Sequence, residues 1–298
     1  MRVFLTGASG FIGSAVVKEL KRAGHQVLGL ARSDAAAGAL QSMGAQVQRG
    51  DLADTEVLAA GARACEGVIH AGFIHDFANY AAACETDRLA VEALGTALAG
   101  SGRPLVVTAG TGVLGMLHPG RVGTEADASD PAVPRGAAEA ATLAWAAQGV
   151  RASVLRLPPS VHGDGDKGFV PQLIATAREK RVSAYIGEGQ NRWPAVHRLD
   201  AACLFRLALE KGDGGTRYHG VADEGVPTRE IAEVIGARLE LPAVSLQAEE
   251  AAGHFGFMGL FFSLDCPASS ALTREQLGWR PKHPGLLADL DRPAYFAA

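Results

Sequence analysis

Short apolar segments alternate with longer segments of helical periodicity through the first half of the chain. Apolar runs bounded by Gly and polar residues are typical of buried strands, whereas apolar residues three and four apart indicate amphipathic helices. This alternation predicts an α/β fold, a doubly wound parallel sheet with helices on both faces. The predicted strands cover residues 2–5, 24–30, 45–52, 67–72, 104–112 and 152–157, and the predicted helices include residues 14–23, 86–99 and 137–147.

The alternation loosens after Gly163, and the second half of the chain has a different organisation. We predict two domains, residues 1–163 around the parallel sheet, with some later segments returning to it, and residues 164–298 as a mainly separate, smaller C-terminal substrate domain. Expected elements of this second half are a helix at 169–179, a strand at 182–186, a loop at 187–194, a helix opening at 196–200 and a helix capped by Thr228.

A glycine-rich turn joins the first predicted strand to the first predicted helix. Residues 6–13 read TGASGFIG, with Gly at every third position. Gly permits a tight bend and a close approach of the backbone to a pyrophosphate, and the free N–H groups of the following helix bind anions. The spacing differs from G-x-G-x-x-G, but its place between strand and helix predicts a dinucleotide site in a Rossmann-type fold. The expected contacts from this turn are Gly7, Ser9, Gly10, Phe11, Ile12 and Gly13.

The end of the second predicted strand bears on which dinucleotide binds. An acidic residue there accepts the ribose 2′-OH of NAD, whereas an Arg accommodates the 2′-phosphate of NADP. The strand ends in Ala31, Arg32 and Ser33, which favours NADP, with NAD as the alternative because a shift of the loop could bring Asp34 to the ribose. Further expected cofactor contacts follow the ends of other strands: Asp51, Leu52, Ala71, Gly72, Thr108, Pro158 and Ser160.

Composition and charge narrow the classes of partner. The 28 Lys and Arg against 32 Asp and Glu give a net charge of −4, which argues against a nucleic-acid partner. The four Cys are far apart and the His are scattered, so we expect no metal site. The chain begins with an apolar strand, and no apolar run approaches the ~20 residues of a membrane span. The sequence therefore predicts a cytoplasmic protein, a monomer or homodimer, that binds a small-molecule substrate and no membrane.

Further motifs resemble the extended short-chain dehydrogenase/reductase family, the group of NAD(P)-dependent epimerases and dehydratases. The resemblance covers almost the whole chain and implies an NAD(P)-dependent enzyme with a smaller substrate domain over the cofactor. Besides the glycine turn, the motifs are Asp51-Leu52, LRLP at 155–158, VHG at 161–163, AVHRLD at 195–200 and LGWRP at 277–281.

The resemblance breaks at the catalytic residues. The family works with a Ser and a Tyr-x-x-x-Lys pair, in which the Tyr transfers the hydroxyl proton while a hydride moves to or from the nicotinamide. Aligning VLG at 113–115 with the family's Val-Tyr-Gly places Gly110 at the Ser, Arg135 at the Tyr and Glu139 at the Lys. The chain therefore resembles the atypical members, which keep the cofactor fold and lose the triad.

Other residues of the strand-end loops are candidates for the chemistry. Thr111 could hydrogen-bond to a substrate carbonyl, and His75, paired with Asp76, could act as a general acid, although for each His alone a structural or solvated role is favoured. Arg135 and Glu139 stand four residues apart and could form an ion pair, either orienting a substrate carboxylate or phosphate or lying on an exposed helix face. The expected substrate contacts are His162, Trp193 and His197.

Three functions remain open. The first is an NADP-dependent oxidoreductase for a small, apolar carbonyl or alcohol, the second an epimerase or dehydratase, and the third a non-catalytic NADP-binding sensor. Residues 254–262 contain four Phe, which would either line an apolar substrate pocket or pack in the core. A sugar nucleotide would require several basic residues around its diphosphate, and only Arg274 and Arg280 are near this segment in the sequence.

Overall fold

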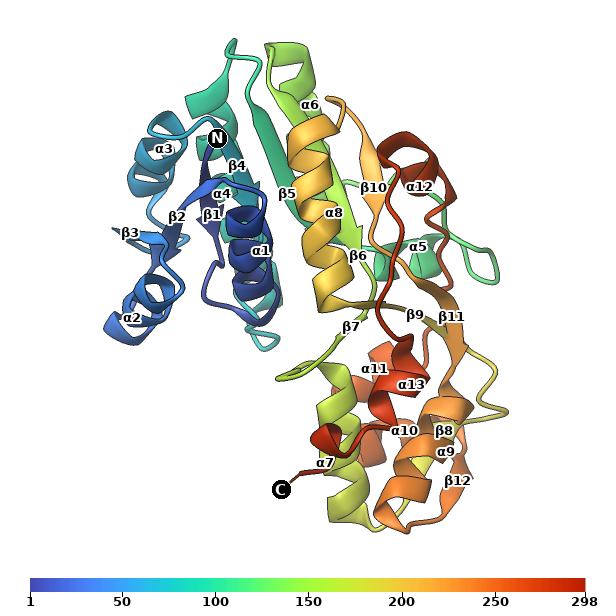
Figure 1. The fold of residues 1–298 in the computed structure, drawn as a ribbon. Coiled ribbons are helices and arrows are strands. Elements are labelled where there is room, and N and C mark those ends of the chain that lie inside the picture. The colour runs from blue at the N-terminus through green and yellow to red at the C-terminus, as the bar shows by residue number, and fades with distance from the viewer. Residues whose placement is uncertain (298) are drawn as a thin grey trace.

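The computed structural model describes residues 1–297, and its largest element is a sheet of seven strands (Figure 1). The strands follow the spatial order β10-β6-β5-β4-β1-β2-β3, and every neighbouring pair is parallel. The chain order reverses between β1 and β4, which is the switch point of a doubly wound sheet. The predicted Rossmann-type fold is confirmed. The strands are β1 (Arg2–Thr6), β2 (Gln26–Ala31), β3 (Gln46–Arg49), β4 (Gly67–His70), β5 (Pro104–Gly110), β6 (Arg151–Leu157) and β10 (Arg217–His219).

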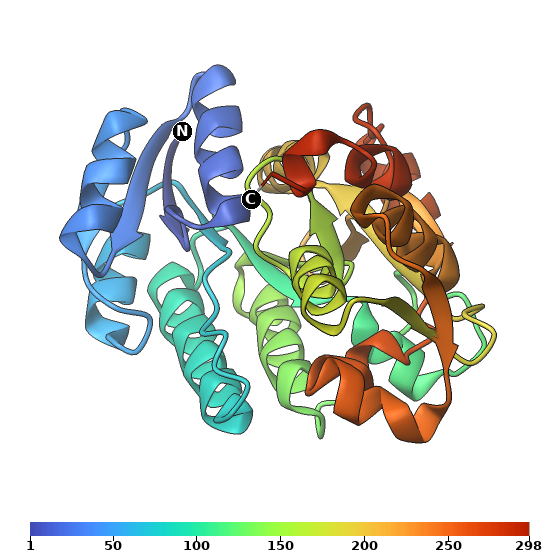
Figure 2. The same ribbon diagram turned by 90° about the horizontal axis from the view of Figure 1, so that it is seen from below.

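Helices cover both faces of this sheet, as Figure 2 shows from below. Val3 and Leu5 of β1 pack in one core cluster with α1, α2 and α8, whereas Phe4, between them, packs in another with α3 and α4. Alternate residues of a strand point to opposite faces, so one apolar run supplies both cores. These helices are α1 (Phe11–Arg22), α2 (Asp34–Ser42) and α8 (Arg198–Lys211) on one face, and α3 (Thr55–Arg63), α4 (Tyr80–Leu98) and α6 (Pro134–Ala144) on the other.

A smaller unit with its own core lies beyond the carboxyl ends of the strands (Figure 1). It contains a three-stranded sheet in the order β11-β9-β7 and the pair β12-β8. Its strands are β7 (Ser160–His162), β8 (Ser183–Ile186), β9 (Arg192–His197), β11 (Asp223–Pro227) and β12 (Ala243–Leu246), and its helices are α7 (Phe169–Lys180), α9 (Thr228–Leu239), α10 (Ala248–Phe255), α11 (Met258–Phe262) and α13 (Leu286–Leu290). Between β9 and β11 the chain returns to the large sheet through α8 and β10, and the short helices α5 (Gly112–Leu117) and α12 (Ala271–Leu277) complete the fold.

Several boundaries in the second half differ from the sequence predictions. The predicted loop after β6 contains β7, and the predicted loop 187–194 already contains the start of β9 at Arg192. Both strands pair with segments distant in the sequence, which a local pattern does not show. Thr228 is not the cap of α9, because Pro227 holds that position and the Thr228 hydroxyl is buried, donating to Oδ1 of Asn191 at 2.6 Å.

Two of the sequence motifs meet at the start of α8. The indole Nε1 of Trp279 donates to the carbonyl oxygen of Asp200 at 3.0 Å. The carboxylate of Asp200 accepts hydrogen bonds from the backbone N–H groups of Lys282 and His283, each at 3.0 Å. The C-terminal LGWRP motif and the residues after it are therefore held against the start of α8, one of the helices that cover the large sheet.

Candidate functional site

The glycine turn after β1 folds tightly against the end of β4. Gly7 has a φ of +67°, which side chains with a Cβ rarely adopt, and a Cβ on it would lie 2.6 Å from the backbone nitrogen of Gly72. A Cβ on Gly13 would overlap the carbonyl oxygen of Gly7. Only glycine fits at both positions, and this close packing brings the first turn of α1 to the carboxyl edge of the sheet.

The N-terminus of α1 carries backbone donors that the helix itself leaves free. Gly10 is the N-cap residue, no side chain of the described residues caps the helix, and its first turn contains no acidic residue. The first N–H with a backbone acceptor in the helix belongs to Ser14, which donates to Gly10 at 2.9 Å. The N–H groups of Phe11, Ile12 and Gly13 are thus available to an anion, so this turn fits the pyrophosphate of a dinucleotide.

Other residues that the sequence predicts to contact the cofactor lie in loops at the ends of neighbouring strands. Asp51 accepts a hydrogen bond from the N–H of Ala53 at 3.1 Å, which shapes the turn after β3. Leu52 lies against Gly72, where a Cβ would be 3.1 Å from its Cδ2 atom. Across the sheet, Pro158 and Ser160 follow β6 and are buried, and the Ser160 hydroxyl has no hydrogen-bond partner among the described residues.

Two arginines lie at the adjoining ends of β2 and β3. Arg32 is exposed, and Ser33 caps α2, accepting from the N–H of Ala36 at 3.2 Å. In the strand register Arg49 is the partner of Ala31, and its guanidinium forms an ion pair with Asp34. Sequence reasoning missed Arg49, although its place at the end of the third predicted strand, beside the second in a doubly wound sheet, was a usable signal.

Arg135 is held at the carboxyl end of β5 by three different contacts. Its Nη2 donates to the carbonyl oxygen of Thr108 at 2.9 Å, and its Cζ lies 4.0 Å from the centre of the Phe73 ring. Its Nη1 is 4.0 Å from Oδ2 of the buried Asp87. The side chain remains 21% exposed, so the guanidinium is fixed in position while keeping N–H donors for a ligand.

The predicted ion pair between Arg135 and Glu139 is wrong. The carboxylate of Glu139 is buried and accepts from Nε of Arg156 at 2.9 Å and from Nε of Arg217 at 2.8 Å. Burial raises the pKa of Glu139, but these two guanidinium groups outweigh burial and hold the pKa below its ordinary value. Glu139 therefore joins α6 to β6 and β10, and its location does not agree with a catalytic role.

The residues after β5 leave space at the position of the family's Ser. A Cβ on Gly110 would have the carbonyl oxygen of Leu157, 3.9 Å away, as its nearest neighbour. Thr111 is fully buried, and its hydroxyl has no hydrogen-bond partner among the described residues. Thr108 donates to the carbonyl oxygen of His70 at 2.9 Å, joining β5 to β4. Thr111 thus reaches a substrate only if the surrounding loops move.

The loop after β4 carries His75 and an aromatic group. His75 is not paired with Asp76 as predicted, because Asp76 accepts from the side chain and backbone of Asn79 and from the N–H of Ala78. Partial burial and then the positive charge of Arg135 lower the pKa of His75 from its ordinary 6.5, so the imidazole is neutral at pH 7. Burial raises the pKa of the nearby Tyr80 to about 12, the opposite of what a catalytic Tyr requires.

Comparison with known proteins shows which family this chain belongs to. The sequence profile of the NAD dependent epimerase/dehydratase family matches residues 3–221. The chain belongs to this family. It is 52% identical over 297 residues to an uncharacterized protein of Schizosaccharomyces pombe, covering 99% of this chain and 100% of that protein. It is also 30% identical to the 2-alkyl-3-oxoalkanoate reductase of Stenotrophomonas maltophilia, over 82% of this chain and 77% of that protein.

Solved structures of the extended short-chain dehydrogenase/reductase family have the same fold. DesIV, a dTDP-glucose 4,6-dehydratase from Streptomyces venezuelae solved with NAD bound, superposes with a TM-score of 0.78 over 99% of this chain and 97% of its own. Its sequence is 21% identical, so the likeness concerns the fold. The chain is therefore a member of an NAD(P)-dependent oxidoreductase family.

The three predicted substrate contacts are shielded from solvent. His162 is fully buried, with Nδ1 2.8 Å from Oδ2 of Asp289, and Trp193 is fully buried between Phe169 and Phe262. His197 is almost completely buried and its Nδ1 accepts from the N–H of Leu199 at 3.3 Å, capping α8. Burial and then the neighbouring imidazoles lower the pKa of His197 to about 4. Their location does not agree with direct substrate contact, because packing within the smaller unit and hydrogen bonds to neighbouring residues already occupy these side chains.

Within residues 1–297, no three His, Cys, Asp or Glu side chains gather in a way that could hold a metal ion. The helices of the same residues are too short or too polar to cross a membrane.

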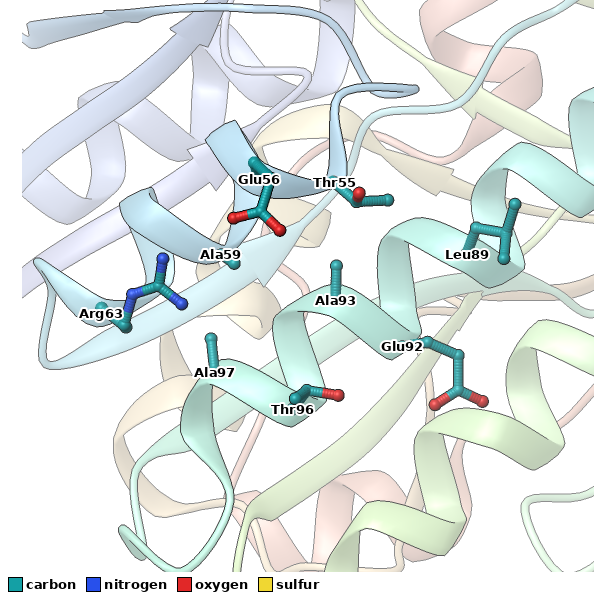
Figure 3. Close-up of a pocket in the computed structure, with 9 residues that line it drawn as sticks. All are labelled: Thr55, Glu56, Ala59, Arg63, Leu89, Glu92, Ala93, Thr96 and Ala97. Atoms are coloured by element: carbon teal, nitrogen blue, oxygen red, sulfur yellow. The ribbon is translucent and has the colours of Figure 1, made fainter.

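A pocket between α3 and α4 is separate from the predicted cofactor and substrate residues. Figure 3 shows it between α3 and α4, with small side chains at its centre and charged ones at its sides. None of the predicted cofactor or substrate residues lines it. Its lining comprises Thr55, Glu56, Ala59, Arg63, Leu89, Glu92, Ala93, Thr96 and Ala97.

Proposed function

We propose that this protein is an NADP-dependent oxidoreductase that interconverts a small, apolar carbonyl compound and its alcohol. The observation that carries the proposal is the placement of Arg135. Its guanidinium is fixed beside the end of β5 and is partly exposed. The alignment of VLG at 113–115 with the family's Val-Tyr-Gly predicts that Arg135 stands at the position of the catalytic Tyr. An arginine there supplies hydrogen bonds and positive charge to a carbonyl oxygen but supplies no proton, because a guanidinium stays protonated in proteins.

The preference for NADP rests on the charges at the ends of β2 and β3. Arg32 and Arg49 place two guanidinium groups near the expected ribose, beside the hydroxyl of Ser33. Asp34, the residue that would favour NAD, is engaged by Arg49. Guanidinium groups bind phosphate through paired, charge-assisted hydrogen bonds, so this corner suits a 2′-phosphate better than a free 2′-hydroxyl.

The chemistry is divided between the cofactor and two side chains. When bound, a nicotinamide dinucleotide supplies a hydride to a carbonyl carbon or accepts one from an alcohol carbon. Arg135 would donate hydrogen bonds to the carbonyl oxygen and stabilise the negative charge that develops on it. His75 would give a proton to that oxygen during carbonyl reduction and take it back during alcohol oxidation.

The name of one relative agrees with this proposal. A reductase of 2-alkyl-3-oxoalkanoates, 30% identical to this chain, is named for a ketone that carries alkyl groups and a carboxylate. An epimerase or dehydratase of nucleotide sugars is less compatible with the site, because a diphosphate requires several cations. Among the described residues, only the guanidinium of Arg135 lies over a ring of the loop after β4. Cytoplasmic location and a monomeric or homodimeric state stay predictions.

A second candidate is a non-catalytic NADP-binding sensor. Two observations favour it. In the sequence alignment, Gly110 stands at the position of the family's Ser and Glu139 at that of its Lys, and Glu139 forms a buried ion pair with Arg156. One experiment separates the two candidates. NADPH binding is measured by calorimetry, and NADPH oxidation is followed with a panel of aldehydes and ketones, for the wild type and Arg135→Ala. Oxidation that Arg135→Ala abolishes supports the oxidoreductase, whereas binding without oxidation of any member supports the sensor.

A further inference from the structure

The side chains next to Arg135 form a continuous aromatic cluster that spans both units of the protein. From Arg135 the contacts run to Phe73, then to Tyr80, 6.1 Å away between ring centres, and on to Phe77 at 6.0 Å. Phe77 stacks on Phe257 with the centres 5.2 Å apart and the planes at 27°. The cluster therefore begins at the proposed catalytic arginine and ends at the segment between α10 and α11.

The outer end of this cluster is exposed to solvent. Phe77 is 37% exposed and Phe257 is 51% exposed, although both are large apolar side chains. Phe261 is partly buried and supports them from below, with its ring 6.0 Å from Phe77 and stacked on Phe169 at 5.6 Å. Exposed aromatic side chains in mutual contact are unusual on a soluble surface unless they bind something. These rings are available to a ligand.

The charges around the cluster define what it could bind. Residues 248–262 contain Glu249 and Glu250 but no Lys or Arg, and the loop at 71–79 contains no Lys or Arg either. Among the described residues, Arg135, at the inner end, is the one guanidinium that lies over a ring of this cluster. A diphosphate needs several cations, whereas an uncharged ring needs only flat apolar surface and one donor for its carbonyl oxygen.

We propose that Phe77, Phe257 and Phe261 bind the apolar group of the substrate, and that this substrate is an aldehyde or ketone carrying an aromatic ring and no phosphate. The ring stacks on Phe257 and Phe77, and its carbonyl oxygen points along the cluster to Arg135. The reduction of this substrate rests on the proposed function, whereas the binding of its aromatic ring does not. Aromatic rings prefer offset stacking, and the exposed parts of Phe257 and Phe77 present ring surface for such a contact.

The binding test uses 2-naphthalenemethanol as the probe, titrated by calorimetry in the presence of NADP. We expect Phe77→Ala and Phe257→Ala each to raise its Kd by about five- to tenfold, as the loss of one aromatic contact predicts. The matched control is Leu89→Ala, a 44% exposed residue of α4 in the pocket of Figure 3, which leaves the Kd unchanged. An unchanged Kd in both Phe variants, or an equal loss in Leu89→Ala, overturns the proposal.

The kinetic test compares 2-naphthaldehyde with propanal as substrates for NADPH oxidation. We expect Phe257→Ala to lower kcat/KM for 2-naphthaldehyde about tenfold more than for propanal. Failure of NADPH oxidation with every carbonyl would refute the proposed function, while probe binding that Phe257→Ala weakens would still support the aromatic site. Equal losses for both substrates overturn this inference and leave the oxidoreductase standing. Sedimentation tests a further alternative, in which the cluster is an interface between two copies of the chain. If the protein is a dimer that Phe257→Ala dissociates while the probe affinity stays unchanged, the inference is overturned.

Discussion

The Oδ2 atom of Asp87 lies 4.0 Å from Nη1 of Arg135 and accepts no hydrogen bond from the described residues. The other oxygen of Asp87 is 3.0 Å from Nε2 of His70, whose Nδ1 is 2.8 Å from the hydroxyl of Thr6. That hydroxyl accepts from the N–H of Gly72 at 3.1 Å. The side chains of Thr6, His70 and Asp87 are buried, so a chain of hydrogen bonds leads from the glycine turn, where the cofactor is expected, to Asp87, whose charge lies beside the proposed catalytic arginine.

Asp87 is therefore predicted to position Arg135. Removing its charge in Asp87→Asn leaves the shape of the side chain but loosens the guanidinium, so kcat/KM for the carbonyl substrate should fall about tenfold. NADPH affinity, measured by calorimetry, should change less than twofold, because the glycine turn keeps its own backbone contacts. The control is Glu92→Gln on the outer side of α4, which should leave both quantities unchanged. A variant that loses cofactor affinity and turnover equally would point to a structural role for Asp87.

The 2′-phosphate assignment predicts a selective effect of two arginines. Arg32→Ala and Arg49→Ala should each lower the affinity for NADPH by about tenfold, because each removes a charge-assisted hydrogen bond to phosphate. The affinity for NADH should change little, since it has no phosphate there. Calorimetric titration of both dinucleotides measures the ratio, with the exposed Arg63 of α3 as the control substitution. Equal losses for NADPH and NADH would exclude the assignment.

The role of His75 predicts a dependence on pH. Because its pKa lies below the ordinary 6.5, the protonated imidazole that reduction requires is populated only in acid, and the neutral imidazole that oxidation requires dominates at pH 7. The rate of carbonyl reduction should therefore rise as the pH falls below about 6.5, and the rate of alcohol oxidation should fall over the same range. His75→Asn should remove both trends, whereas His118→Asn should retain them. Profiles of kcat/KM for the two directions provide the measurement.

The fold was readable from the sequence because its signals are local. The glycine turn, the buried apolar strands and the helix after each strand depend on neighbouring residues, and β1 to β6 formed close to where they were predicted. The contacts of the site are not local. Glu139 takes its partners from β6 and β10, 17 and 78 residues away, so spacing along one helix suggested the wrong partner, Arg135.

The sequence nevertheless contained clues to some of these contacts. Arg156 stands within an apolar strand, and a buried arginine requires an acidic partner. The burial of Trp193 and His162 had no such signal, because it depends on residues such as Phe262 and Asp289 that are distant in the sequence. Local pattern thus predicts the strands and the glycine turn better than the packing around these two side chains.

Gly110 should accept the family's serine without loss of stability. A Cβ there has no neighbour closer than 3.9 Å, and φ is not in the left-handed region, so Gly110→Ser introduces no clash. By restricting the unfolded chain, the substitution should change the free energy of unfolding by less than about 1 kcal/mol, measured in urea. Gly7→Ser is the contrasting variant, since its positive φ and its closeness to Gly72 should destabilise the turn and weaken NADPH binding.

Glu139 should determine stability rather than catalysis. Glu139→Gln leaves Arg156, which is fully buried, without its charge partner, and such a loss costs about 3–5 kcal/mol of unfolding free energy. Since the pKa of Glu139 in the folded protein lies below its ordinary 4.5, the carboxylate stabilises the fold above that pH. This contribution is lost as the pH falls through the lowered folded-state pKa.

Urea unfolding at several pH values tests this behaviour. The wild type should lose stability as the pH drops below about 4.5, and the curve of Glu139→Gln should be flatter over that range. Glu85→Gln is the matched control, because its ion pair with Arg88 is exposed to solvent and should contribute little to stability. If Glu139→Gln instead retained full stability at pH 7 but lost NADPH oxidation, Glu139 would act in the reaction, and its ion pairs with Arg156 and Arg217 would then serve the site instead of the fold.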